Sequence, residues 1–167
     1  MKRIKGETIA SVFASMIQER RLLISALDAF RDEDLDFRPV TPKPAHLLSV
    51  REIFLHLIDA DRRLVENAIE GRDLHLRYSV CDESASVLMN LTREIVDREG
   101  IRKALKASWR GVERILSRPA SALLQKPAPD HPTSLLTLLG FAQTHAAHHR
   151  GQLLTYLALL GRPLGEE

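Results

Sequence analysis

Three of the seven histidines in this chain lie within five consecutive residues, in the segment Thr144–Gln152 (THAAHHRGQ). His145 and His149 are four residues apart, so on a helix they share one face, a turn apart. This spacing lets two imidazoles reach one metal ion, as in helical metal sites generally. His148 lies about 100° around the helix from His149 and is less well placed for the same ion. The segment therefore predicts either a metal site or a pair of hydrogen-bonded or solvated helix histidines.

The steps between apolar positions place the histidine pair on the inward side of this helix. Residues that follow alternating steps of four and three form the predicted seam: Leu138, Ala142, His145, His149, Gln152, Tyr156 and Leu159. An unsatisfied buried polar group costs roughly 1–3 kcal/mol, and a metal ion would satisfy both imidazoles at once. On this seam Gln152 either lines the same cavity or bonds to a neighbouring helix.

A third metal ligand has to come from another helix. His56, in the segment Phe54–Asp61 (FLHLIDAD), lies beside an apolar stripe and could turn toward the bundle interior. Taken alone, His56 is better explained as a helix-edge histidine that packs beside the core than as a metal ligand. Asp59 and Asp61 are the nearby carboxylates that could accept a hydrogen bond from His56 and fix its tautomer.

Other candidate groups have weaker support. The single cysteine, Cys81, precedes two acidic residues, which disfavour a thiolate, so a functional thiol is not expected. Arg150 is expected to be solvated or salt-bridged. His46, His75 and His131 lie in or near connecting segments and are expected at the surface. A serine nucleophile elbow and a glycine-rich phosphate loop are both absent from the sequence.

Apolar periodicity predicts four helices that position these groups. They span about Glu7–Phe30, Ser49–Glu70, Arg98–Ser117 and Ser134–Leu160. A period of two, typical of strands, is not evident anywhere in the chain.

Helix start and stop residues support these boundaries. Ser49 and Glu52 form a capping box, S-x-x-E, and Gly71 is a natural stop for the helix that follows it. Asp97 is a candidate N-cap, and Gly161 follows the last helix. The segment Arg72–Asp97 is predicted to be a long crossing connection that contains a short helix. The predicted fold is therefore an all-α four-helix bundle with a long connection between helices 2 and 3.

Length and composition favour one domain over residues 1–167 and exclude several function classes. A chain of 167 residues with 44% hydrophobic residues can bury a core without staples, and one cysteine excludes an internal disulfide or a cysteine-rich zinc module. The net charge is only +2 and the basic residues are dispersed, so no nucleic-acid partner is expected. No apolar run is long enough for a membrane span or a signal peptide, so no membrane partner is expected and the predicted location is cytoplasmic.

Two motifs together resemble the DinB/YfiT-like family of small metal-binding four-helix bundles. They are SVREIFLHLIDADRR and HAAHHRGQLLTYLALLGRP, with FRP before the second helix also in agreement, so the resemblance covers most of the chain. Position by position, the family's three metal-binding histidines fall on His56, His145 and His149. His148 matches a frequent extra histidine that is not usually a ligand. The segment around Arg72–Asp97 matches no family pattern.

The resemblance implies a divalent metal ion, commonly nickel or zinc, and often a homodimer. Relatives include thiol-dependent transferases and a thiol-dependent maleylpyruvate isomerase. Three neutral ligands leave the ion's charge uncompensated, which favours ionising a bound water (pKa about 7) or a thiol. The expected function is thus a metal-dependent enzyme that either transfers a low-molecular-weight thiol to small electrophiles, including thiol-assisted isomerisation, or hydrolyses a small substrate. The alternative is a non-catalytic metal-binding or dimeric interaction module in stress response. Catalytic residues beyond the ligands are not identified, and Asp59, His148 and Gln152 are candidates to line or support the site.

Overall fold

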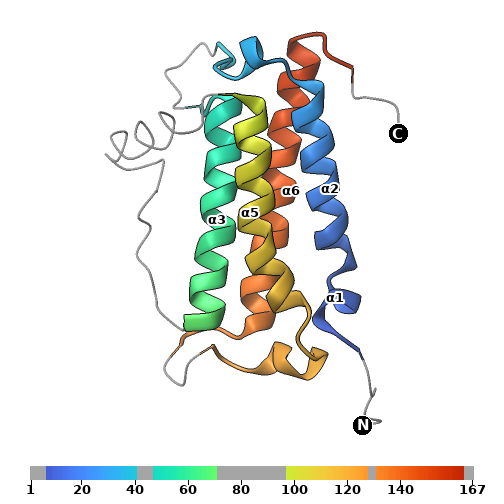
Figure 1. Ribbon diagram of the computed structural model, residues 1–167, viewed down its shortest axis with the longest axis vertical. Helices are drawn as coiled ribbons and strands as arrows, with labels where there is room; N and C mark the ends of the chain where they lie inside the picture. The colour runs from blue at the N-terminus through green and yellow to red at the C-terminus, as the bar shows by residue number, and fades with distance from the viewer. Residues whose placement is uncertain (1–6, 41–46, 71–96, 128–130, 164–167) are drawn as a thin grey trace.

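Four long helices lie side by side along the length of the molecule. The computed structural model describes residues 7–40, 47–70, 97–127 and 131–163, which are helical apart from connecting segments and one isolated bridge. The long helices are α2 (Ala14–Ala29), α3 (Val50–Glu70), α5 (Arg98–Leu116) and α6 (Leu135–Leu159) (Figure 1). Shorter pieces are α1 (Ile9–Val12), η1 (Asp32–Asp34) and η2 (Ala120–Leu124). The predicted all-α bundle is confirmed.

The order of the helices around the bundle decides which residues face each other. α3 packs against both α5 and α6, and α2 packs against α6 and α5. In Figure 1, α3 and α5 begin at the same end and are parallel, whereas α6 runs opposite to α3. The connection between α3 and α5 includes residues 71–96, which lie outside the described residues, together with the predicted short helix, Gly71 and Cys81. None of the described helices is both long and apolar enough to cross a membrane.

Local capping signals fix the helix ends that bear on the site. The Ser49 N–H donates to the Glu52 carboxylate at 2.7 Å, and the Glu52 N–H donates to Ser49 Oγ at 3.2 Å, as the capping box predicts. Asp97 accepts from the Gly100 N–H at 2.7 Å at the start of α5. Gly161 ends α6 with φ +64°, a conformation that glycine adopts without steric cost. The predicted ends of these three helices are confirmed to within one residue.

The predicted first helix is wrong in one respect, because it breaks at Phe13. Phe13 has φ −107° and ψ 37°, and it separates α1 from α2. The segment before it is held by the turn after α5, where the Ile9 N–H donates to the Arg118 carbonyl at 2.8 Å. This docking changes the chain direction so that Ile9 and Phe13 are both buried, while Val12 is 50% exposed.

The core consists of two apolar clusters, one toward each end of the bundle. One cluster includes Leu27, Phe54 and Leu153, and the other includes Leu64 and Leu139. His56 on α3 lies between Phe54 and Leu64 in the chain, and the histidines of α6 lie between Leu139 and Leu153. The three histidines are therefore at the level where the two clusters meet.

Candidate metal centre

Three imidazoles from two helices converge on one point. His56 comes from α3, and His145 and His149 come from adjacent turns of α6. The Nε2 atoms of His56 and His145 are 2.8 Å apart, and those of His145 and His149 are 3.1 Å apart. The ligand atoms of all three residues lie within 4.8 Å of one another. The structure thus brings together the three histidines that the sequence singles out.

These nitrogen positions fit a shared metal ion. Metal–nitrogen bonds of about 2.0–2.1 Å place two ligand nitrogens of one ion roughly 2.9–3.4 Å apart at bond angles of about 90–110°. Without a cation, three ring nitrogens face one another, and a single N–H on the central His145 Nε2 could satisfy only one of its two close contacts. A cation at that point would satisfy all three lone pairs.

Gln152 holds one of the rings in the tautomer that a metal requires. The Gln152 side-chain oxygen lies 2.7 Å from His149 Nδ1, so Nδ1 donates and carries the proton. The other ring nitrogen of His149, Nε2, is then left with a lone pair that faces His56 and His145. The sequence left open whether Gln152 lines the same cavity or bonds to a neighbouring helix; among the described residues its hydrogen bond is to His149, in its own helix α6.

Burial keeps the imidazoles neutral. The pKa of His56 falls to about 4, mainly because of burial and also because of the two neighbouring histidines and Arg63. The pKa of His145 also falls to about 4, again mainly through burial, with contributions from His149, His148 and Arg63. Burial also lowers the pKa of His149, although the Gln152 hydrogen bond opposes this shift. Neutral rings are the form that binds metal.

An aromatic ring and a further histidine flank the trio on α6. The ring of Phe141 stacks on His145 with centroids 5.7 Å apart and planes 14° from parallel. Phe141 is 70% exposed, so its other face is open to solvent. His148 is exposed, and its ring centroid lies 5.0 Å from that of His149, but it is not part of the converging trio. The sequence analysis missed Phe141, whose position one turn before His145 was the available signal.

The two aspartates near His56 have other partners. Asp59 is buried, and its ion-pair partner is Arg62 at 4.0 Å; no hydrogen bond between Asp59 and His56 is found among the described residues. Asp61 forms an ion pair with Arg20 of α2 at 2.8 Å, so it does not support His56 as the sequence analysis considered.

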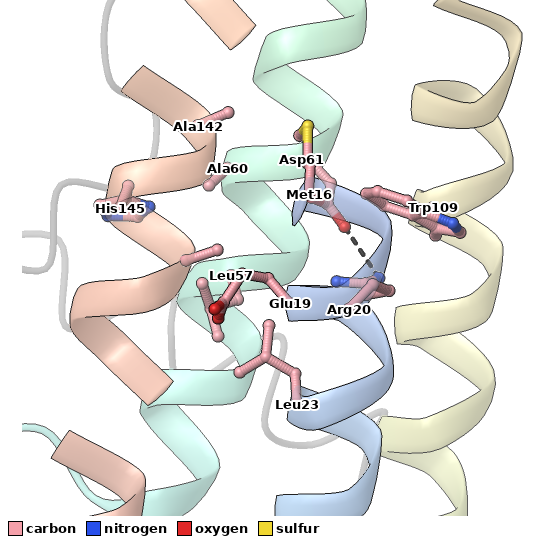
Figure 2. A pocket seen from close by; sticks show the side chains of 11 residues that line it. Met16, Glu19, Arg20, Leu23, Leu57, Ala60, Asp61, Trp109, Ala142 and His145 are labelled. Atoms are coloured by element: carbon pink, nitrogen blue, oxygen red, sulfur yellow. Dashed lines mark ion pairs between the residues drawn. The ribbon is translucent and has the colours of Figure 1, made fainter. Parts of the chain in front are cut away.

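A small pocket lies inside the bundle next to His145 (Figure 2). Side chains from all four long helices line it, with Arg20 and Glu19 from α2, Asp61 from α3 and Trp109 from α5 among them. The Arg20 guanidinium lies 5.1 Å from the Trp109 ring centroid, and Ser108 donates to Asp61 at 2.8 Å. The buried ion pair between Arg20 and Asp61 thus lies on the interior side of the histidine site.

Two other predictions about polar residues have clear outcomes. Arg150 forms two hydrogen bonds with Glu19, at 2.7 and 3.1 Å, so its salt-bridged interpretation is confirmed. His131 is only 5% exposed and its Nδ1 lies 2.9 Å from the Thr133 carbonyl, so the predicted surface position is wrong. His46 and His75 lie outside the described residues.

Comparison with known proteins identifies the family. A family model described as the DinB superfamily matches residues 15–153, which include all three converging histidines. Neither the curated proteins nor the solved structures give a match. The match extends from α2 into the last third of α6, well over half of the chain, and members of this family bind metal. The chain therefore belongs to the DinB superfamily.

Proposed function

We propose that this protein is a divalent-metal-dependent enzyme that activates a low-molecular-weight thiol, or water, for attack on a small electrophile. The observation that carries the proposal is the convergence of His56, His145 and His149 on one point, with Nε2 atoms 2.8 and 3.1 Å apart. Nickel or zinc is the expected ion because the family resemblance implies one of these two, and imidazole nitrogen suits both.

The residues around the ion support this chemistry. A divalent ion held only by neutral imidazoles keeps its charge largely uncompensated. It lowers the pKa of a bound water to about 7 and favours the thiolate form of a bound thiol. His56 and His145 stay neutral at physiological pH, since burial lowers the pKa of each to about 4. Gln152 orients His149 by accepting from its Nδ1 at 2.7 Å. Three protein ligands leave positions on the ion for water or substrate.

Transfer of a thiol is the leading reaction, because thiol-dependent transferases occur in the family that the sequence motifs resemble. Hydrolysis is the second reaction open to the same site. The single-domain organisation of residues 1–167, the cytoplasmic location and the homodimer belong to the same proposal. The rival is a metal-binding module without catalysis, in which the ion contributes only stability.

Two variants test the proposal. Nickel- or zinc-loaded wild type should accelerate conjugation of cysteine to a chromogenic aryl halide, or hydrolysis of an activated ester, relative to the same metal in buffer. His145→Ala should lose the bound metal and the acceleration while remaining folded by circular dichroism, because the apolar clusters above and below the site stay intact.

The matched control is His148→Ala, which removes an exposed imidazole next to the trio and should leave both metal and rate unchanged. Loaded wild type that is no faster than free metal in both assays would contradict catalysis. If His145→Ala then also unfolds at a much lower temperature than loaded wild type, the result supports the rival hypothesis, in which the ion only stabilises a non-catalytic module.

A further inference from the structure

An arginine of α3 lies level with the aromatic edge of the histidine site. α3 and α6 are antiparallel (Figure 1), and Tyr156 Oη donates to the Leu48 carbonyl at 3.0 Å while His56 contacts His145. Residues after His56 on α3 are therefore level with residues before His145 on α6. Arg63, seven residues after His56, is on the same face of α3 two turns along. Its Cα is thus level with Leu138 of α6, about one turn farther from His145 than Phe141 is, and a side chain that leans back by one turn reaches the level of Phe141.

The Arg63 side chain belongs to the surroundings of the histidines. Side chains on a helix lean toward its N-terminus, so Arg63 leans back toward His56. It is half-buried, so part of its side chain packs against neighbouring groups instead of extending into solvent. A guanidinium has five N–H donors, so Arg63 can hold a protein partner and a ligand at the same time.

Phe141 provides an apolar surface at the same level. One face of its ring covers His145, and the residue is nevertheless 70% exposed. An exposed aromatic ring beside a cation offers a place for a short apolar segment that ends in an anionic group. From this register we expect the approach to the three histidines to combine one apolar wall, Phe141, with one guanidinium, Arg63.

We propose that the ligand of this site is an anionic thiol, whose sulfur binds the ion held by His56, His145 and His149 and whose carboxylate binds Arg63. The short chain between the two groups lies against Phe141. This inference rests on the thiol reaction proposed above and specifies its substrate class. It makes Arg63 a specificity-determining residue and assigns it no part in metal binding.

Cobalt(II)-loaded protein offers a direct readout that does not depend on activity, since a thiolate bound to cobalt absorbs light. Wild type is titrated with 3-mercaptopropionate and with the neutral 3-mercapto-1-propanol, which have the same spacing between sulfur and terminal group. The expected result is roughly tenfold tighter binding of the carboxylate thiol, the size of one charge-assisted hydrogen bond at a half-buried site. Arg63→Gln should remove this preference, and Arg63→Lys should keep part of it.

The matched control is Arg62→Gln, which removes the same charge from the neighbouring position, where the side chain is 53% exposed and faces Asp59. It should leave the preference unchanged. Equal binding of both thiols by wild type, or an unchanged preference in Arg63→Gln, overturns the inference and leaves the proposed function standing. Cobalt binding without a thiolate band from either thiol overturns the inference together with the thiol reaction. Failure of the three histidines to hold cobalt overturns the proposed function as well.

Discussion

At the scale of single residues, the candidate site depends on where imidazole nitrogens point. The i, i+4 spacing of His145 and His149 predicts a shared face, and that pair is indeed 3.1 Å apart. The contact with His56 joins positions 89 residues apart. The residues alone made His56 a candidate third ligand, and the family resemblance selected it. Gln152 was on the predicted seam, but its choice of His149 as partner depends on side-chain rotamers that spacing does not fix. Arg63 and Phe141 were not singled out, because neither residue type is a metal ligand; for Phe141 the position one turn before His145 was the available signal.

The lowered histidine pKa values predict how the metal-free protein responds to pH. In the unfolded chain an imidazole binds a proton near pH 6.5, whereas in the folded chain His56 and His145 do so only near pH 4. Between these values the unfolded state holds more protons, so the free energy of unfolding should fall as the pH falls from about 6.5 to about 4. Urea unfolding of chelator-treated protein at pH 7, 6 and 5 measures this dependence.

The double variant His56→Gln/His145→Gln is the reference for that experiment. Asp59 has the opposite effect. Burial raises its pKa to about 6, so its protonation increases the free energy of unfolding as the pH falls. Wild type and variant both keep Asp59, so the difference between them isolates the histidines. The urea midpoint of wild type should fall more steeply than that of the variant, and parallel curves would contradict neutral buried imidazoles.

At the scale of helices, local signals predict the ends well and the faces less well. Ser49, Asp97 and Gly161 act through neighbouring backbone groups, so their roles were readable in the sequence. The seam predicted for α6 is displaced, because Leu139 and Leu153 are fully buried while Leu159 is 61% exposed. A helix of 25 residues with 3.6 residues per turn drifts away from a strict heptad, and the drift accumulates toward its end. The break at Phe13 comes from the contact with Arg118, which is distant in sequence.

Removing only one charge of the ion pair between α2 and α3 should lower the free energy of unfolding. Arg20 and Asp61 have side chains only 7% and 14% exposed. Arg20→Met leaves a buried carboxylate without its cation, and the free energy of unfolding should fall by about 3 kcal/mol. The double variant Arg20→Met/Asp61→Leu should recover much of that loss, because it removes both charges. Urea unfolding of the two variants at pH 7 gives the comparison.

Arg102 serves as the control for this pair. Arg102 contacts Asp28 across α5 and α2, where the Asp28 side chain is 46% exposed, so Arg102→Met should cost less than about 1 kcal/mol. If Arg20→Met/Asp61→Leu were no more stable than Arg20→Met, the unpaired charge of Asp61 would not be the cause of the loss. That result would mean that the hydrogen bonds of Arg20 to the Leu105 carbonyl and Ser108, rather than its charge, stabilise the bundle.

At the scale of the whole molecule, the bundle brings two histidine-bearing helices together as direct neighbours. α3 packs against both α5 and α6. It runs parallel to α5 and antiparallel to α6 (Figure 1). Helix number and order were predictable from periodicity and from the long interval between Glu70 and Arg98. The neighbour relations were not, because they depend on how apolar surfaces of all four helices fit together. Because the histidines lie between two apolar clusters, we expect the fold to persist when the site is altered.

The metal content of the purified, untagged protein tests the central claim most directly. Elemental mass spectrometry after incubation with nickel or zinc and removal of free ions should find about one ion per chain. The variant His56→Ala/His145→Ala/His149→Ala should hold none, whereas His148→Ala should match wild type. Wild type that stays empty after incubation with nickel, zinc, iron and manganese, or an ion retained by the triple variant, would contradict a metal centre at these three histidines.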